Sequence, residues 1–397
     1  MTAASVMLLA LQWSGQAQAQ AQAPIRIGIL NDQSGIVSDA NGKGSVIAAQ
    51  MAVDDFGGKV LGRPIEISGA DHQNKADIGA SIARQWYDQG FDLVADTPNS
   101  AVALAVQEIS KQKQKMFINV GGVVHDLSGK FCTPYSFHWM NDTAVMASVL
   151  PKMMVKDGAK KWYFIGANYT FGQILRRDAT EVIDAAGGSV VGGVEHPIEA
   201  TDFSSYIIGA KASGADVIAL ANAGENTANS LKQANEFGIG IGGKQKIAAL
   251  NAAFHDIVSI GLDTAQGLTL MEPYYWDLND ETRAWSKRFQ EKKGMPPSVN
   301  QASVYGAIMH YLKAVQAAGS VEASAVAAKM KELPVNDFMI KNGVVRPNGR
   351  LVRDVYVFQV KTPAESKSKF DVYKLVATIK GADAYKPLNE EGCPLIK

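Results

Sequence analysis

The apolar and polar positions of the chain predict the same order of elements twice. Each series begins with an apolar strand, a polar loop, a helix that ends at two glycines, and a second strand: 25–30, 31–44, 45–56 and 64–68 in the first series, then 162–166, 167–170, 171–186 and 189–195 in the second. Both series continue with a helix, a strand, a polar loop, another helix and a last strand. A repeated βαβαβα order predicts an α/β protein with two lobes, each a parallel sheet covered by helices.

Polar loops at the carboxyl ends of these strands are the candidate binding segments, because the ligands of parallel sheets lie beyond that edge. The loops of the first series are 31–35, 97–100 and 121–123, and those of the second series are 168–172, 222–226 and 251–253. Two sheets whose carboxyl ends face each other enclose a cleft. We predict that this cleft is the functional site.

Two of these loops carry side chains that suit a small anion or an apolar ligand. Thr97, Asn99 and Ser100 surround a helix N-terminus, whose free N–H groups attract negative charge, although helix capping alone would also explain them. Tyr169 and Phe171 lie at a strand end and could stack on a ligand, and the alternative for them is packing at the start of a helix. The first lobe therefore offers anion-binding groups and the second offers aromatic rings.

The chain after residue 270 does not continue the second series. The pattern predicts helices at 281–292, 301–318 and 321–333, a hairpin-like pair of strands at 344–347 and 355–361, and a last strand at 371–377. We expect the chain to cross into the second lobe at 136–142. The predicted division is a leader at 1–23, a first lobe of 24–141 plus 271–350, and a second lobe of 142–270 plus 351–397.

Composition and charge exclude several classes of function. The 397 residues, of which 47% are hydrophobic, are enough for two domains with cores. The 39 basic and 39 acidic residues leave no basic excess, so nucleic acid is not expected as a partner. No histidine has metal-ligand spacing to another, and neither a phosphate-binding Gly/Lys loop nor a nucleophile elbow is present. We therefore expect no enzyme, no metal and no cofactor.

The first 23 residues predict an export signal. A short apolar run at 6–11 precedes an alternating Gln/Ala stretch, and Ala21 and Ala23 form an Ala-x-Ala cleavage pattern before Pro24. A basic residue near the start is missing, and a low-complexity leader is the alternative. No later stretch is apolar enough for a transmembrane helix. We predict that the mature protein is exported.

Two cysteines, Cys132 and Cys393, are present. In an exported protein an even, small number favours one disulfide, which would tie the tail to the middle of the chain. The alternative is two unpaired buried thiols. We favour the disulfide because Cys393 lies in the polar tail 390–394, where burial is not expected.

Several segments, taken in order, resemble one family. They are 25–30 with Ser34-Gly35, 60–66, 168–172, and 265–268 before Glu272. The chain from 24 to 397 resembles the leucine/isoleucine/valine-binding branch of the type I periplasmic solute-binding proteins of ABC transporters. The resemblance implies two Rossmann-like lobes joined by a three-strand hinge, closure on a ligand, and delivery to permease subunits in the membrane. It also implies a periplasmic location, a monomer, and a disulfide between a mid-chain cysteine and a C-terminal Cys-Pro.

The resemblance further implies where a ligand binds. First-lobe loops of that family hold the ligand carboxylate, and second-lobe aromatic residues cover the ligand. The candidate ligand-binding residues here are Ser34, Thr97, Asn99, Ser100, Gly121, Gly122, Val123, Tyr169, Phe171, Asn222, Asn251 and Glu272. The expected ligand is a small carboxylate, either a branched-chain or related amino acid or an aromatic acid.

Two departures from the family pattern bear on the ligand. Amino-acid binders usually carry Thr where Val123 falls, and an acidic residue near Ala252 to pair with the ammonium group. Because a buried ammonium without a carboxylate is costly, the hypothesis is a carboxylate without an amino group, unless Glu225 supplies the charge. A ligand-sensing module of a receptor would use the same cleft and is the alternative function.

Overall fold

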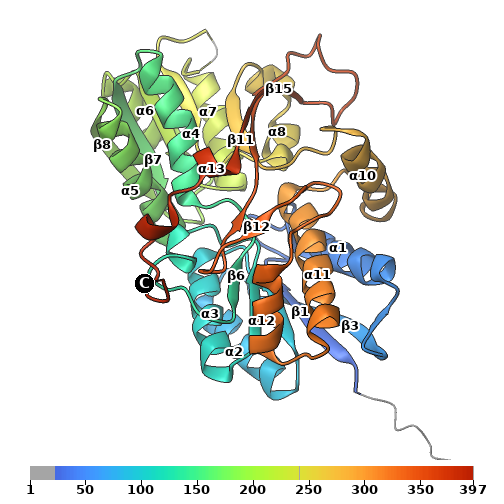
Figure 1. Cartoon of the computed structure of the whole chain (residues 1–397). Helices are drawn as coiled ribbons and strands as arrows, with labels where there is room; N and C mark the ends of the chain where they lie inside the picture. Colours follow the sequence, from blue (N-terminus) through green and yellow to red (C-terminus); the bar gives the residue numbers. More distant parts are fainter. Residues whose placement is uncertain (1–22, 241, 397) are drawn as a thin grey trace, which may run out of the picture.

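The computed structural model describes residues 23–240 and 242–396, so the predicted signal peptide lies outside the described residues except for Ala23. Two lobes stand one above the other, and each contains a sheet covered by helices (Figure 1). The sheets are separate, with six strands in the first lobe and four in the second. The predicted α/β class with two lobes is therefore confirmed.

The first sheet has the strand order β2-β3-β1-β4-β5-β6. Its strands are β1 (Ile25–Asn31), β2 (Lys59–Val60), β3 (Arg63–Asp71), β4 (Leu93–Asp96), β5 (Met116–Asn119) and β6 (Ser136–His138). All neighbours are parallel except β2 and β3. β1 lies in the middle and is buried along almost its whole length, which explains why its sequence from 25 to 30 is apolar except for Arg26.

The helices of the first lobe come from distant parts of the chain. They are α1 (Gly42–Phe56), α2 (Ala76–Asp88), α3 (Ser100–Lys113), α10 (Asp280–Lys293), α11 (Val299–Ala318) and α12 (Ala323–Glu332). α11 packs along α1 and α12 (Figure 1). It begins at a capping box, in which Ser298 accepts a hydrogen bond from the N–H of Gln301 (3.0 Å), and ends at Gly319 in the left-handed conformation.

The second sheet repeats the central part of the first. Its order is β10-β9-β7-β8, and all neighbours are parallel. The elements are β7 (Lys161–Ala167), β8 (Ser189–His196), β9 (Val217–Ala221), β10 (Lys246–Ala249), α4 (Thr143–Lys156), α5 (Thr170–Ala185), α6 (Ser204–Ala212), α7 (Glu225–Glu236), α8 (Phe254–Ile260) and α9 (Leu262–Ala265). In the first lobe β1 lies between β3 and β4, and β5 follows β4; in the second lobe β7 lies in the same way between β8 and β9, and β10 follows β9. The repeated sequence pattern therefore corresponds to a repeated topology.

A third, antiparallel sheet consists of β11 (Thr269–Glu272), β14 (Val355–Val360) and β15 (Tyr373–Ile379). Side chains of all three strands pack into the core of the second lobe, and the predicted lobe boundary at 271 divides β11. The predicted pairing of 344–347 with 355–361 is wrong. β12 (Val344–Val345) pairs instead with β13 (Leu351–Val352), because a turn closed by the N–H of Gly349 on the carbonyl of Arg346 reverses the chain at once.

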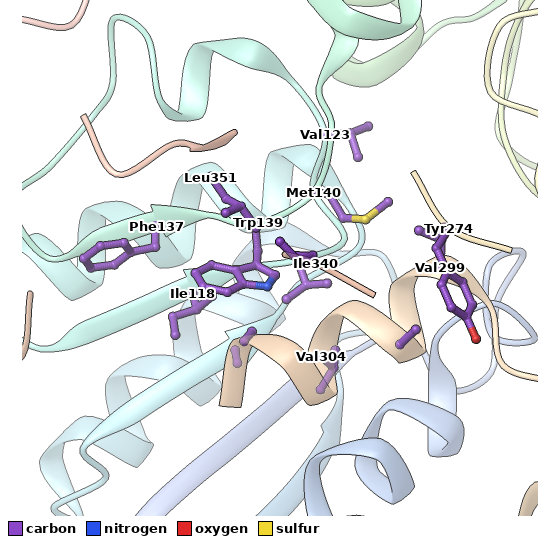
Figure 2. Packing of buried hydrophobic residues seen from close by; sticks show 14 of the residues in the cluster. Ile118, Val123, Phe137, Trp139, Met140, Tyr274, Val299, Val304, Ile340 and Leu351 are labelled. Atoms are coloured by element: carbon purple, nitrogen blue, oxygen red, sulfur yellow. The ribbon is translucent and has the colours of Figure 1, made fainter. Parts of the chain in front are cut away.

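The crossing from the first lobe to the second is deeply buried. Trp139 is fully buried, and Figure 2 shows its indole ring beside Ile118, Ile340 and Leu351. Next to it, Asp142 caps α4 and forms an ion pair with Arg350 (2.9 Å). Arg350 is 0% exposed. Because a buried charge is tolerated only when paired, this ion pair fixes the crossing.

The C-terminal tail is tied to the first lobe. The tail contains α13 (Gly381–Ala384) and η2 (Leu388–Glu390), and a disulfide joins Cys393 to Cys132, which follows η1 (His125–Leu127). The predicted disulfide is confirmed, but the expectation that Cys393 is not buried is wrong, since it is 5% exposed. Arg346 accounts for part of this burial by binding Glu391 (3.2 Å) and holding the tail down.

Replacing either cysteine by Ser should lower the free energy of unfolding by about 2–5 kcal/mol, because the bond closes a very long loop. The cysteines are 261 residues apart. Urea denaturation of the oxidised protein measures the change. The double replacement should cost no more than either single one, since all three variants lack the same bond. A Cys393→Ser variant as stable as the parent would contradict the prediction.

Candidate functional site

A cavity of about 90 Å³ lies between the carboxyl ends of the two parallel sheets. Its first-lobe wall consists of Ile36, Val37, Ala40, Asn41, Asn74, Pro98, Asn99, Ser100, Gly121, Val123, Ser298, Val299 and Asn300. Its second-lobe wall consists of Tyr169, Phe171, Ile198, Ala223, Gly224, Asn251, Ala253 and Asp256. Amide and hydroxyl groups alternate with apolar side chains, which suits a small molecule with both a polar and an apolar part.

The loop before α1 forms one part of the wall and is fixed at both ends. Asp32 accepts hydrogen bonds from the N–H groups of Gly35 (2.7 Å) and Val37 (3.1 Å). At the other end, the side-chain amide of Gln301 on α11 donates to the carbonyl of Asp39 (3.0 Å). The loop therefore presents its apolar side chains to the cavity in a fixed conformation.

The N-terminus of α3 forms a second part of the wall. Asn99 caps the helix by accepting hydrogen bonds from the N–H groups of Ala101 (3.0 Å) and Val102 (3.2 Å). The hydroxyl of Ser100 is buried and has no hydrogen-bond partner among the described residues. Because an unpaired buried hydroxyl costs free energy, Ser100 is the group on this wall best suited to a polar atom of a ligand.

The turn that leads into α3 has a strained backbone. Asp96 and Thr97 have φ angles of 88° and 55°, which residues with a Cβ adopt only when the surroundings impose them. The Thr97 hydroxyl lies 3.1 Å from Oδ1 of Asn119, which also accepts the N–H of Gly122 (2.9 Å). These bonds set the position of Gly121 and Pro98 at the cavity from behind the wall.

Tyr169 and Phe171, at the start of α5, bring aromatic rings to the second-lobe wall. Their ring centroids lie 6.4 Å apart. Phe171 is 4% exposed and belongs to the main hydrophobic core, whereas Tyr169 is only partly buried against it. Phe171 therefore both packs and lines the cavity, and Tyr169 offers the more accessible ring.

The two lobes touch at the edge of the cavity. Gly224 has a φ of +57°, and a Cβ at this position would lie 2.3 Å from the carbonyl oxygen of Ile36. The N–H of Glu225 approaches the same oxygen (N···O 3.4 Å). Only glycine allows this approach, so the structure corresponds to a closed cleft.

Asp256 is the one charged side chain among the described residues of the wall. It lies on α8, and its Oδ2 accepts a hydrogen bond from the N–H of Ala253 (2.9 Å). Burial raises the pKa of Asp256 to about 7, and the charge of Asp39 acts in the same direction. A carboxylate in this position favours a ligand with a positive group.

Glu272 lies behind α8 rather than on the wall. Its Oε1 accepts a hydrogen bond from the N–H of Phe254 (3.1 Å), and its Oε2 has no partner among the described residues. Burial raises the pKa of Glu272 well above its ordinary value, and the charge of Asp256 raises it further. Glu272 therefore supports the start of α8 from behind the wall.

The structure brings seven of the twelve predicted site residues to the cavity: Asn99, Ser100, Gly121, Val123, Tyr169, Phe171 and Asn251. The other five lie outside the wall: Ser34, Thr97, Gly122, Asn222 and Glu272. Ser34 donates its hydroxyl to Asp71 (2.6 Å), and the amide of Asn222 donates to Ser230 (3.0 Å). These polar groups already have partners inside their own lobe.

Sequence reasoning missed Asp256 as a wall residue. The family pattern predicts the acidic residue near Ala252 in the strand-end loop 251–253, whereas the carboxylate comes from the following helical turn. The signal was the spacing of Ala253 and Asp256, since an acidic residue at the third helical position can accept the N–H of the residue before the helix. Glu225, the alternative source of charge, is exposed and lies outside the wall.

Two α/β lobes that close on a small cavity define a solute-binding protein. The family model for periplasmic binding proteins matches residues 24–368, and the chain belongs to this family, in its branched-chain amino acid branch. Members of the family bind solutes in the periplasm and are not enzymes. None of the helices within 23–240 and 242–396 combines the length and the apolar character that crossing a membrane requires.

Three relatives illustrate the similarity. A periplasmic binding protein from Burkholderia mallei is 43% identical, with a TM-score of 0.91 over 94% of this chain and 99% of that one. A branched chain amino acid ABC transporter periplasmic ligand-binding protein from Burkholderia xenovorans is 37% identical, with a TM-score of 0.85 over 94% and 100%. Leu/Ile/Val-binding protein homolog 4 of Brucella abortus is 24% identical over 317 residues, 76% of this chain and 75% of that protein.

The two aromatic residues should respond differently to truncation. Phe171→Ala should lower the free energy of unfolding of the ligand-free protein by about 3–5 kcal/mol, because the replacement leaves a cavity in the core. Tyr169→Ala should cost about 1–2 kcal/mol, as expected of a partly buried side chain. Denaturant titration of both variants measures the difference, and equal losses would contradict the assignment of Phe171 to the core.

Proposed function

We propose that this protein captures a zwitterionic amino acid with an apolar side chain in the interlobe cavity and delivers it to the permease subunits of an ABC importer. The observation that carries the proposal is that Ser100 and Asp256 lie on opposite walls of one cavity. The first offers donors to a carboxylate, and the second offers a negative charge to an ammonium group. A ligand that fits both walls carries both groups.

The carboxylate site is built without a cationic side chain among the described wall residues. The N-terminus of α3 supplies backbone N–H groups and a partial positive charge. Ser100 adds a hydroxyl, and the strained turn at Asp96 and Thr97 sets the position of Gly121. Hydrogen bonds of this kind to a carboxylate are charge-assisted and therefore strong.

The ammonium site changes the choice of ligand made from sequence. A carboxylate ligand without an amino group would place a negative charge in a cavity whose one carboxyl group among the described wall residues is Asp256. Repulsion between the two would weaken its binding unless Asp256 is protonated. A free amino acid can place its carboxylate at the N-terminus of α3 and its ammonium group at Asp256.

The remaining wall selects the side chain of the solute. Ile36, Val37, Ile198, Val299 and Tyr169 supply the larger apolar surfaces. Burial of an apolar side chain against them provides about 25 cal/mol per Å². The similarity to the Burkholderia xenovorans protein, a branched chain amino acid ABC transporter periplasmic ligand-binding protein, supports both a branched-chain amino acid as solute and an ABC importer as partner.

Capture is proposed to occur by hinge closure between the predicted lobes, 24–141 plus 271–350 and 142–270 plus 351–397, with the whole of β11 moving with the second lobe. The contact of Gly224 with Ile36 supports this, because no solute can pass that edge while the lobes touch. Permease subunits would recognise the closed form. A monomer suffices, since both walls come from one chain.

Calorimetric titration with L-leucine and with benzoate tests the proposal. Leucine should bind to the parent protein. Asp256→Asn should lower the affinity for leucine by about thirtyfold or more, because loss of one member of a buried charge pair costs about 2 kcal/mol or more. Benzoate should bind more weakly than leucine to the parent and should not be weakened by the replacement. Benzoate binding tighter than leucine would overturn the proposed solute class.

The same carboxylate predicts the pH dependence of leucine binding. Because burial raises the pKa of Asp256 to about 7 in the closed cavity, protonation below that pH removes the charge that pairs with the ammonium group. Leucine affinity should therefore fall by about tenfold for each pH unit below this value. The Asp256→Asn variant should lose this acid limb, and an unchanged parent affinity at about pH 5 would contradict the assignment.

A further inference from the structure

A cluster of charged side chains joins the two lobes beside the cavity. His125, at the start of η1 in the first lobe, has its Nδ1 2.8 Å from Oδ2 of Asp178 on α5 in the second lobe. Its Nε2 lies 3.2 Å from Oδ1 of the adjacent Asp126. Arg177 on α5 lies 2.9 Å from Asp178 and 3.6 Å from Asp126. Two charge contacts, His125 to Asp178 and Arg177 to Asp126, therefore cross from one lobe to the other.

This cluster lies on the same segments as the cavity wall. Val123 of the wall precedes His125 by two residues, and Phe171 of the wall precedes Asp178 by about two helical turns on α5. Between them, Ile174 of α5 packs against a hydrophobic cluster of the first lobe. In this form the contact between the two walls and the contact of His125 with Asp178 therefore lie on the same two segments.

The position of the imidazole ring selects its charged form. Each ring nitrogen faces a carboxylate, and only a protonated imidazole can donate hydrogen bonds from both nitrogens. The side chains of Asp178 and Asp126 are 2% and 6% exposed, so water competes little for these contacts. A neutral ring would satisfy one carboxylate and direct a lone pair at the other.

The charged groups around His125 come from every element packed against it. They are Asp126 and Lys130 from its own segment, Arg177, Asp178 and Glu181 from α5, Asp142 from the start of α4, His138 from β6, Glu391 from the tail, and Arg346 and Arg350 from the segment after α12. Asp142 is paired with Arg350, and Glu391 with Arg346. Arg177 opposes protonation of the ring, with its Nη2 3.5 Å from both ring nitrogens.

The balance of these effects favours the proton. Burial lowers the pKa of His125, but the hydrogen bond and the charge of Asp178, with the charges of Asp142 and Asp126, outweigh it and raise the pKa above its ordinary value. A raised pKa in the closed form means that closure takes up a proton. The resulting stabilisation is complete below about pH 6.5, the ordinary value for His, and is lost as the pH rises through the raised value.

We propose that His125 is a positioning residue for solute capture: its protonated ring bridges carboxylates of both lobes and stabilises the closed form, so closure weakens when the ring loses its proton. The inference rests on the proposed function, because it assigns closure a role in capture. Affinity for the solute would then fall at alkaline pH through this cluster. The acid limb set by Asp256 is a separate effect at a separate site.

The positions of the lobes in the ligand-free protein test the proposal without reference to the solute. Lys43 on α1 and Lys232 on α7 are exposed and lie on different lobes. Nitroxide labels on cysteines introduced there, with the native disulfide intact, report the distance between the lobes by electron–electron double resonance. The ratio of closed to open protein should fall by about threefold to tenfold between about pH 6 and pH 9.

Matched variants in the labelled protein separate the bridge from other effects. His125→Gln and Asp178→Asn should each abolish the change in this ratio with pH, and the double replacement should do no more than either. Lys130→Gln is the control, because it removes a cation of the same cluster whose partner, Asp126, lies on the same segment (2.9 Å). This control variant should keep the pH dependence. Melting curves establish that each variant is folded.

Two results would overturn the proposal: equal distance distributions of the parent at both pH values, or a pH dependence that survives in His125→Gln. Failure of the proposed function would look different. Leucine and benzoate would then not bind in calorimetry, while the labels would still report a pH-dependent closure. The two failures are therefore distinguishable in the same set of proteins.

Discussion

The buried ion pair between Asp142 and Arg350 fixes the geometry on which the rest of the molecule depends. Asp142 both ends the crossing from the first lobe and caps α4 of the second, while Arg350 lies next to the turn whose Gly349 carbonyl accepts the N–H of His138 (2.9 Å). Loss of either partner would leave an unpaired charge in the interior. The pair thus keeps the carboxyl ends of the two sheets directed at each other, which is the condition for a shared cavity.

In the proposed mode of binding, the cavity divides recognition between the lobes. The first lobe contributes backbone N–H groups and a hydroxyl from a strained turn, and the second contributes a carboxylate and aromatic rings. Neither wall is complete alone, so the free energy of solute binding is gained only when the lobes meet. This arrangement explains why the hydroxyl of Ser100 lacks a partner among the described residues even in the closed form. Asn99 and Asp256, by contrast, also accept backbone N–H groups of their own lobes.

Much of the fold could be predicted from sequence, because parallel strands buried on both faces leave continuous apolar runs such as 25–30. The strand-end loops could be predicted as well, because each begins where an apolar run ends. Sequence could not tell which polar residues of those loops already have partners, and Ser34 and Asn222 are the examples. It also missed Asp256, which lies one helical turn beyond a strand end, and the partner of β12, which a single turn determines.

The contact between Gly224 and the Ile36 carbonyl bears on kinetics. If a bound solute leaves only when this edge opens, its residence time equals the lifetime of the closed state. Exchange would then be slow or fast according to how often the lobes part, whatever the strength of the individual contacts. In the proposed function, discharge into a transporter would therefore require that the partner separate the lobes, not that it compete for the solute.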